Sequence, residues 1–195
     1  MSSTCRGSER RLDDAYLTPG WAVLRLLETW TPPAGTLVEP ARGDGSIVRA
    51  VGSRRPWVSY DIRDVHPEST FHRRGDFLTV ATPSPSVVAV VTNPPYSLAE
   101  EFVRKSRELY QNAELVFLLR LAFLASEKRL QLWRDIGTPD VYVLPNRPSF
   151  TGGGTDSADY AWFHWPKAWT DKSCGPQCFG NIRVLASTPA SERRP

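Results

Sequence analysis

The stretch VVAVVTNPPY, which covers residues 87–96, decides the fold of this chain. Residues 87–92 form a continuous, mostly β-branched run, which is typical of a strand buried on both faces of a sheet. The strand ends before the two prolines, since neither has an N–H to donate to a neighbouring strand. Residues 97–100 read SLAE, the spacing of a capping box, and predict a helix that reaches about Tyr110. The sequence therefore predicts a strand–turn–helix unit with polar residues at the turn.

Strands and helices alternate on either side of this unit. The apolar patterns predict strands at 36–38, 57–60 and 114–119, and helices that start at 18–19 and cover 46–51 and 122–134. This alternation favours an α/β fold in which right-handed crossovers join a mostly parallel, twisted sheet. Beyond residue 137, predicted strands follow one another without a helix between them, so this end is expected to be an antiparallel hairpin. These strands are at 140–144, 160–165 and 182–185.

The composition is that of an ordinary globular protein. Of 195 residues, 41% are hydrophobic and 23% are charged, which excludes wholesale disorder. The formal net charge is only +3, so charge alone does not require a nucleic-acid partner. The longest apolar run, residues 116–125, is interrupted by Arg120 and is too short to cross a membrane. The N-terminal residues lack the apolar segment of a signal peptide, so a reducing cytoplasm is the expected location.

The cysteines do not indicate a disulfide framework or a metal site. Cys5, Cys174 and Cys178 are too few for a disulfide scaffold. Cys174 and Cys178 could suggest zinc together with His164, but the spacing is unusual and a fourth ligand is missing. No metal is therefore predicted.

Polar and glycine-rich residues follow the carboxyl ends of three predicted strands, where open α/β sheets bind ligands. Residues 39–45 read EPARGDG, and Gly43 and Gly45 allow a tight turn and the close approach of a ligand. The loop is not a dinucleotide fingerprint, because Val48 stands where the third glycine would fall. Asp61 ends the next strand and can accept hydrogen bonds from both hydroxyls of a ribose. On these residues alone, an ordinary turn at Gly43 and Gly45 with a strand-end cap at Asp61 is as good an interpretation as a ligand-binding site.

The third such site, NPPY at residues 93–96, resembles the motif of S-adenosylmethionine-dependent methyltransferases that act on planar amides and amines. Together with its setting, it makes the chain look like an adenine-N6 DNA methyltransferase, similar to the small phage and prophage members of that class. The resemblance covers most of residues 15–165. YLTP at 16–19 comes first, then the 39–45 loop and then NPPY, in the order of the class that places target recognition last. The resemblance implies a Rossmann-like class I methyltransferase fold with S-adenosylmethionine as cofactor.

The same resemblance implies a set of cofactor-binding residues. The 16–19 motif would pack on the methionine end of the cofactor. Asp76 would hold the exocyclic amine of its adenine ring, and Phe77 would cover the ring face. Many relatives have Asp where this chain has Glu39, but the acid is retained. The implied residues are Tyr16, Thr18, Pro19, Glu39, Pro40, Ala41, Gly43, Gly45, Asp61, Ile62, Asp76, Phe77 and Asn93.

The catalytic residues implied are Asn93, Pro94, Pro95 and Tyr96. The exocyclic amine of adenine is a poor nucleophile, because its lone pair is delocalised into the ring. The side-chain oxygen of Asn93 and the carbonyl of Pro94 can accept its two N–H groups, and the rigid Pro-Pro pair aims that carbonyl. Tyr96 supplies a face on which the base stacks. A base inside a duplex cannot reach such a pocket, so it must be flipped out or already unpaired.

The substrate is less tightly defined than the chemistry. Arg147, Ser149 and Phe150 are expected to contact the flipped base or a phosphate, with a plain hairpin loop as the alternative. Residues 42–74 hold seven basic against four acidic side chains, and a few of these are expected to contact phosphates of DNA. Enzymes with the same motif methylate a glutamine amide in release factors, and similar motifs occur in RNA methyltransferases. Both substrates remain alternatives, as does an inactive module that binds the cofactor.

The length suits one catalytic domain and little else. We expect a flexible segment at 1–14, a single methyltransferase domain at 15–186 and a flexible tail at 187–195. The short sequence leaves hardly any room for a separate target-recognition domain, so sequence preference should be relaxed or supplied by a partner. The protein is expected to be a monomer or weak dimer, with no membrane partner, in the cytoplasm of a bacterium or a phage-infected host.

Overall fold

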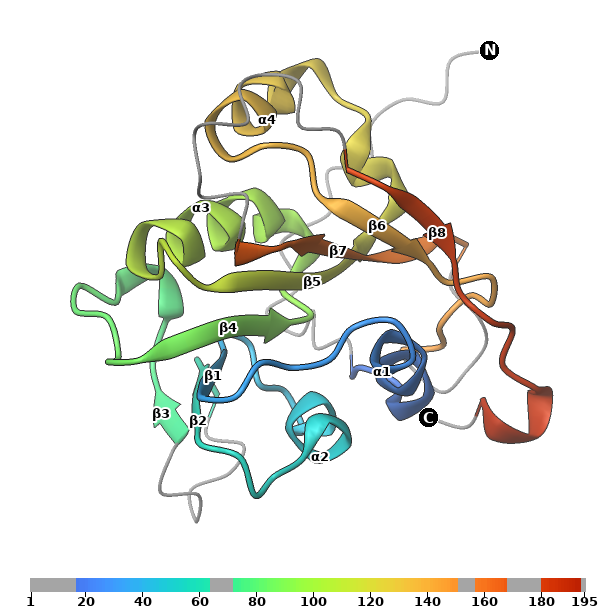
Figure 1. Ribbon diagram of the computed structural model, residues 1–195, viewed down its shortest axis with the longest axis horizontal. Helices are drawn as coiled ribbons and strands as arrows, with labels where there is room; N and C mark the ends of the chain where they lie inside the picture. Colours follow the sequence, from blue (N-terminus) through green and yellow to red (C-terminus); the bar gives the residue numbers. More distant parts are fainter. Residues whose placement is uncertain (1–16, 64–71, 151–156, 168–179, 194–195) are drawn as a thin grey trace.

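The computed structural model describes residues 17–63, 72–150, 157–167 and 180–193, and they form three layers (Figure 1). A sheet of eight strands lies between two pairs of helices, with α1 and α2 on its lower face and α3 and α4 on its upper face in Figure 1. The helices are α1 (Gly20–Leu27), α2 (Ser46–Val51), α3 (Ala99–Leu109) and α4 (Leu130–Ile136). None of the helices in this described part is long and apolar enough to span a membrane.

The sheet is parallel over its first five strands and mixed at its C-terminal end. Its strands are β1 (Thr36–Glu39), β2 (Trp57–Asp61), β3 (His72–Arg74), β4 (Val87–Thr92), β5 (Glu114–Arg120), β6 (Asp140–Val143), β7 (Tyr160–Trp165) and β8 (Ile182–Val184). Their spatial order is β3-β2-β1-β4-β5-β7-β6-β8. β7 is antiparallel to β5 and to β6. The expected α/β sheet with an antiparallel C-terminal hairpin is therefore confirmed.

β4 is buried on both faces of the sheet, as its run of β-branched residues predicts. Val91 packs into the core that includes α1 and α2, and Val90 packs into the core that includes α3 and α4. Successive side chains of a strand point to opposite faces, so both layers of helices require apolar residues from this strand. The observed bounds of β4 are the predicted ones.

The turn after β4 differs from the expected capping box. Residues Tyr96–Leu98 form a 3₁₀ turn, closed by a hydrogen bond of 2.9 Å from the Leu98 amide to the Pro95 carbonyl. α3 begins at Ala99, and no side chain caps its N-terminus. The backbone that the prolines constrain forms the turn, so Ser97 has no capping role.

The helix predicted over 122–134 is wrong in its first half. Two 3₁₀ turns, Leu121–Leu124 and Glu127–Arg129, precede α4, and Ser126 between them is extended. Phe123 packs into the core, and the Arg129 guanidinium carbon lies 4.4 Å from the centroid of its ring. Tertiary packing of Phe123 thus overrides the local helical pattern.

The sequence analysis missed the edge strand β3 and the direction of the other edge strand, β8, whose position it predicted. β8 is parallel to β6, although the whole C-terminal end was expected to be antiparallel. β7 already has β5 and β6 on its two edges, so a strand that reverses direction after β7 joins the far edge of β6 and runs parallel to it. At the other edge, β3 consists of three polar residues beside β2, and no apolar pattern indicates it.

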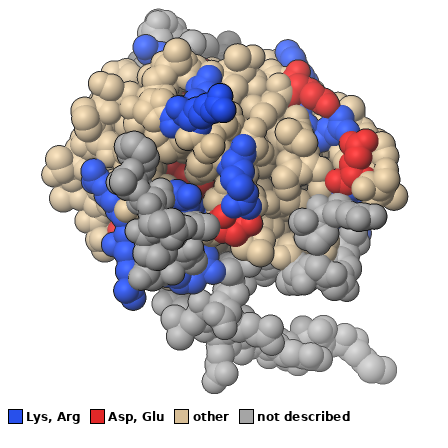
Figure 2. Space-filling model, turned by 90° about the horizontal axis from the view of Figure 1, so that it is seen from below, with Lys and Arg blue, Asp and Glu red and all other residues tan. Residues whose placement is uncertain are grey.

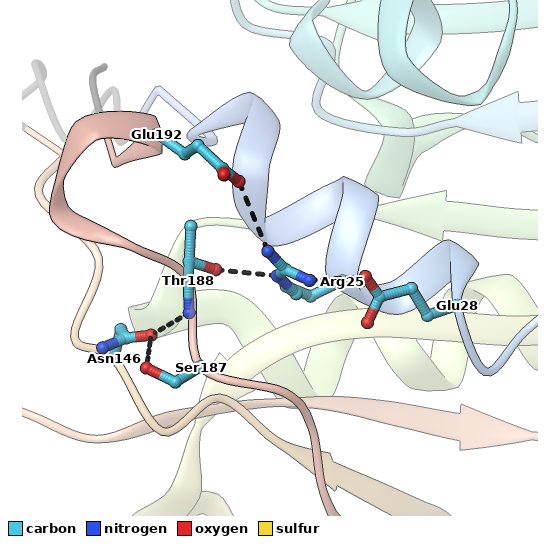
Figure 3. Close-up of polar contacts among 6 residues, drawn as sticks. All are labelled: Arg25, Glu28, Asn146, Ser187, Thr188 and Glu192. Carbon is cyan, nitrogen blue, oxygen red and sulfur yellow. Dashed lines mark hydrogen bonds and ion pairs between the residues drawn. The ribbon is translucent and has the colours of Figure 1, made fainter.

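Residues 187–193 pack on α1, where the sequence suggested a flexible tail (Figure 3). Thr188 is 1% exposed, and its hydroxyl accepts a hydrogen bond of 2.9 Å from Nε of Arg25. The Thr188 amide donates to Oδ1 of Asn146 at 2.6 Å. Arg25 also forms an ion pair of 3.4 Å with Glu192. These contacts fasten the last described segment to the first helix.

Thr188→Val tests this attachment. Valine keeps the shape of threonine but cannot accept the hydrogen bond from the largely buried Arg25, so the free energy of unfolding should fall by about 1 kcal/mol. Urea denaturation followed by tryptophan fluorescence measures the change. Ser187→Ala is the matched control, because the exposed Ser187 hydroxyl makes a longer contact of 3.2 Å with Asn146. Equal losses in the two variants would contradict a specific role for Thr188.

Candidate active site

The carboxyl ends of β1, β2 and β4 meet at one edge of the sheet. The three strands are parallel neighbours, so Glu39, Asp61 and Asn93, at or directly after their last residues, lie along this edge. The chain adds β2 and β3 on one side of β1 and β4 and β5 on the other, so the strand order reverses between β1 and β4. Open α/β sheets bind their ligands at such a switch point.

The glycine-rich loop after β1 is tied to the end of β2. Gly43 and Gly45 have φ of +55° and +80°, a left-handed conformation that only glycine adopts without steric cost. The Gly43 amide donates a hydrogen bond of 2.9 Å to Oδ2 of Asp61. Asp44 accepts hydrogen bonds from the amide and the hydroxyl of Ser46, at the start of α2. The loop therefore turns tightly where the two strands end.

Asp61 is held as a carboxylate. Its Oδ1 accepts hydrogen bonds of 2.9 and 3.0 Å from the amide and Nε of Arg63. Burial raises the pKa of Asp61, but the hydrogen bonds from Arg63 and Gly43 outweigh it, so the pKa lies below its usual value. A ribose would meet an ionised acceptor here, part of which the Arg63 side chain now occupies.

Glu39 is an acid of the opposite kind. It is 1% exposed, and its Oε2 has no hydrogen-bond partner in the described part of the chain. Burial raises the pKa of Glu39 well above its usual value, although the positive charge of Arg42 offsets part of the effect. Pro40 and Ala41, which follow it, are buried and half-buried. A buried acceptor without a partner requires an explanation, and a cationic donor from a ligand would satisfy it.

The N-terminal motif lies beside the glycine loop. Thr18 and Pro19 are buried directly before α1, and Leu17 is exposed. A side chain built at Gly43 would meet Leu17 at 4.0 Å, so the two segments are adjacent. Tyr16 of the same motif lies outside the described residues. Leu17 therefore lies beside the 39–45 loop, and the expected packing of the motif on the methionine end of the cofactor stays a prediction.

Of the residues expected around an adenine ring, Phe77 is buried, whereas Asp76 and Ile62 are exposed. Phe77 is 1% exposed, and its ring is stacked on Phe102 with centroids 5.7 Å apart. The expected contact of the Phe77 ring face with the cofactor is not supported, because α3 covers that ring. Asp76 is exposed, and its Oδ1 accepts a hydrogen bond from the Leu78 amide. Ile62, after β2, is 61% exposed, so it offers an apolar surface at this end of the site.

The NPPY motif brings an aromatic cluster to the site. Asn93 and Pro94 are buried directly after β4, and Tyr96 follows in the 3₁₀ turn. The Tyr96 ring centroid is 5.3 Å from that of Tyr160 and 6.1 Å from that of Phe150. Burial raises the pKa of Tyr96 well above its usual value, so its phenol is neutral at physiological pH.

The three residues expected to contact substrate, Arg147, Ser149 and Phe150, lie in different surroundings. Phe150 lies edge-on against Tyr96, so the structure brings it to the motif. Ser149 has a buried hydroxyl for which the described residues provide no hydrogen-bond partner. Arg147 forms an exposed ion pair of 2.8 Å with Asp159.

Arg120 and Tyr160 are site residues that sequence reasoning did not single out. Arg120 ends β5, and its guanidinium carbon lies 5.2 Å from the centroid of the Tyr96 ring. Tyr160 is the residue paired with Arg120 on the adjacent antiparallel strand β7. The available signal was a charged residue at the end of an apolar run, but the cross-strand pairing depends on tertiary structure.

The basic residues of the 42–74 stretch do not share one location. Arg54 and Arg55 precede β2, at the amino-terminal edge of the sheet, and Arg55 donates to the carbonyls of Pro32 and Pro33. Figure 2 shows most Lys and Arg side chains of this face on its left and in its middle, whereas the larger acidic groups lie at its right and in its middle. Some of this stretch, including Arg54 and Arg55, therefore lies away from the carboxyl edge.

Among the described residues, no group of three or more His, Cys, Asp and Glu side chains could hold a metal ion. Cys174 and Cys178 lie outside that part of the chain, as does Cys5.

No protein-family model and no curated protein matches the sequence. Solved structures match the fold. A candidate class I S-adenosylmethionine-dependent methyltransferase from Listeria monocytogenes aligns with a TM-score of 0.55 at 12% identity, over 88% of this chain and 64% of that one. A dimethyladenosine transferase from Plasmodium falciparum gives 0.55 at 13% identity, over 75% and 61%. The methyltransferase subunit of a type I restriction-modification system from Streptococcus thermophilus gives 0.56 at 16% identity, over 78% and 45%.

The chain covers 64%, 61% and 45% of the length of these three chains, and at such low identity the likeness concerns the fold. The parallel strands, the antiparallel C-terminal hairpin and the glycine loop at the switch point agree with it. The protein has the fold of the class I S-adenosylmethionine-dependent methyltransferases.

Proposed function

We propose that this protein transfers a methyl group from S-adenosylmethionine to the exocyclic N6 amine of adenine in DNA. The observation that carries the proposal is the position of NPPY, which follows β4 at the switch point. The neighbouring strand β1 ends at Glu39, and Asp61 ends β2 on the far side of β1. Ligand and reacting amine would then meet at the same edge of the sheet.

The residues after β1 and β2 fit the cofactor. The unpartnered oxygen of Glu39 suits a donor with a positive charge, such as the ammonium of a methionine. The ionised Asp61 suits two hydroxyls of a ribose, provided that the Arg63 side chain gives way. Exposed Ile62 offers apolar contact to a purine. When bound, S-adenosylmethionine supplies a methyl group activated by the positive charge of its sulfur.

The residues after β4 fit a planar amine. Asn93 Oδ1 and the Pro94 carbonyl can accept the two N–H groups, which leaves the nitrogen lone pair free to attack. After transfer, the methylated nitrogen carries a positive charge and loses one of its two protons to solvent. No proton has to be removed before the nitrogen reacts, so geometry and electrostatics supply most of the catalysis. Asn93 is buried, so a paired base cannot reach it without leaving the duplex.

Two features favour adenine in nucleic acid over a protein amide. The YLTP motif precedes the 39–45 loop and NPPY, in the order of the adenine class. Tyr96 is partly exposed and packs on the buried rings of Phe150 and Tyr160, so it is the ring of this group on which a base could stack. The fold likeness extends to a restriction-modification subunit and to an rRNA methyltransferase, so the choice of DNA over RNA rests on the resemblance of the motifs and not on the fold. RNA, a glutamine amide and an inactive module are outcomes of the test below.

Asn93→Ala tests the proposed role of the motif. The variant should lose at least about a hundredfold in methyl transfer, since one positioned acceptor is removed, while cofactor affinity stays within about threefold. Tritiated S-adenosylmethionine is incubated with DNA, RNA and a release factor in turn, and cofactor binding is measured by calorimetry. Asn112→Ala, in an exposed turn before β5, is the control and should be fully active.

If tritium is transferred to RNA or to the release factor but not to DNA, DNA is not the substrate and the labelled molecule takes its place. Cofactor binding by the wild type without label in any of the three would support the inactive module instead.

Cofactor binding should release a proton from Glu39. Burial raises the pKa of Glu39, and a bound ammonium would lower it again, so affinity should rise with pH as the free carboxyl deprotonates. Calorimetry in two buffers of different ionisation enthalpy, between about pH 6 and about pH 8, measures the proton. Glu39→Gln should abolish the release and weaken binding, whereas Glu101→Gln on the exposed side of α3 should change neither.

The same shift has a second readout in the free protein. Because the folded state holds the Glu39 proton more tightly than the unfolded chain, the free energy of unfolding should fall as pH rises from the usual pKa of glutamate to the raised value. Glu39→Gln should flatten this dependence. An unchanged pH profile in that variant would contradict the assignment.

A further inference from the structure

The guanidinium of Arg42 lies close to Glu39. Nη1 of Arg42 donates a hydrogen bond of 2.9 Å to the hydroxyl of Ser59, the residue of β2 that is paired with Glu39. Leu37 and Trp57, two residues earlier on the same two strands, pack into the core that includes α1 and α2. Side chains alternate along a strand, so Glu39 and Ser59 point to that same face of the sheet. The bond to Ser59 therefore holds the positive charge of Arg42 beside the buried carboxyl.

The other edge of this guanidinium is free. Nε and Nη2 of Arg42 donate no hydrogen bond within the described part of the chain, and Nε is buried. The two atoms lie 3.3 and 3.4 Å from the point that a Cβ atom of Gly45 would occupy. Nη1 of Arg49 lies 3.5 Å from the same point, although Arg49 is already paired with Asp44 at 2.8 Å. Because glycine has no side chain, a small space that suits an anion remains in front of the free edge.

Glu39 does not neutralise Arg42 in the free protein. Burial raises the pKa of Glu39 well above its usual value, and the charge of Arg42 only opposes this shift. A carboxyl that keeps its proton carries no charge, and no carboxylate of the described residues forms an ion pair with Arg42. Glu39 and Arg42 each retain a buried polar atom that finds no hydrogen-bond partner in the same part of the chain. Such atoms cost free energy, so a ligand that offers both a donor and an acceptor would stabilise the pair.

An amino acid has the two charges that this pair requires. Its ammonium and its carboxylate are bonded to one carbon atom, so a site for both needs an acid and a base side by side. Glu39 supplies the acid and the free edge of Arg42 supplies the base. The Nε–Nη2 edge of an arginine donates two parallel hydrogen bonds to one carboxylate, which is the strongest form of this contact.

We propose that Arg42 binds the carboxylate at the methionine end of S-adenosylmethionine while Glu39 binds the ammonium, so that the 39–45 loop selects a ligand with both charges. The inference rests on the proposed function and deepens it, because it names a residue that determines specificity for the cofactor.

The test compares two ligands that differ only in the carboxylate. Decarboxylated S-adenosylmethionine keeps the sulfonium and the ammonium, so it can still bind Glu39 and Asp61. Calorimetry measures the affinity of both ligands for the wild type and for Arg42→Gln, Arg42→Lys and Arg49→Gln, in the absence of nucleic acid. The wild type should bind S-adenosylmethionine at least about tenfold more tightly than the decarboxylated ligand, because a charged bidentate contact is lost.

Arg42→Gln should reduce this ratio to about twofold or less, mainly by weakening S-adenosylmethionine. Arg42→Lys keeps the charge but not the edge with two donors, so its ratio should lie between those of the wild type and of Arg42→Gln. Arg49→Gln is the matched control, because it removes the same charge next to Gly45 from a side chain that is already paired with Asp44. It should keep the wild-type ratio, and thermal unfolding of each variant measures any loss of folded protein.

Three results would overturn the inference. One is a wild-type ratio in Arg42→Gln or, if that variant does not fold, in Arg42→Lys. Another is an equal loss of affinity for both ligands in Arg42→Gln, which would mean that Arg42 only supports the charge of Glu39. The third is an equal fall of the ratio in Arg49→Gln, which would indicate a general effect of positive charge.

Failure of the proposed function has a different signature. The expected ratios without any methyl transfer to DNA would refute the proposed substrate and still support the role of Arg42. A wild type that binds neither ligand would refute both.

Discussion

The burial of β4 on both faces constrains where chemistry can occur in this protein. Val90 and Val91 belong to two different cores, so the strand cannot shift along its axis without disturbing both layers of helices. Its end is therefore fixed, and with it the position of Asn93. The prolines after Asn93 extend this rigidity into the turn. A motif that must hold a planar amine thus stands at the end of a strand that both cores hold in place.

The features that depend on local pattern could be predicted from the sequence. The bounds of β4 and α2 follow from a β-branched run and a short apolar helix, and the turn at Gly43 follows from glycine conformation. The features that depend on distant contacts could not. Phe77 looks like a ligand contact in sequence but is stacked on Phe102, and the pairing of Arg120 with Tyr160 is set by strand register.

The pKa values of the two acids of the site, Asp61 and Glu39, are shifted in opposite directions. Hydrogen bonds from Arg63 and from backbone amides stabilise the negative charge of Asp61, so it stays ionised without a ligand. Glu39 has an oxygen with no hydrogen-bond partner in the described residues, and burial favours its protonated form. Asp61 is therefore ionised before a ligand binds, but the Arg63 side chain occupies part of it. The buried carboxyl of Glu39 destabilises the free protein until a cation binds to it. Sites commonly carry such strain, because the groups that bind a ligand tightly are poorly solvated without it.

The attachment of α1 has a consequence for the order in which the molecule folds. Arg25 meets Thr188 across 163 residues of chain, and the Ala22 carbonyl meets Trp162 across 140. α1 therefore depends on contacts with residues that are synthesised well over a hundred residues later. Contacts of such high sequence separation form late, because loop closure is slow. Residues 17–19, directly before α1, are thus expected to become fixed later than elements held by contacts between near neighbours in the sequence.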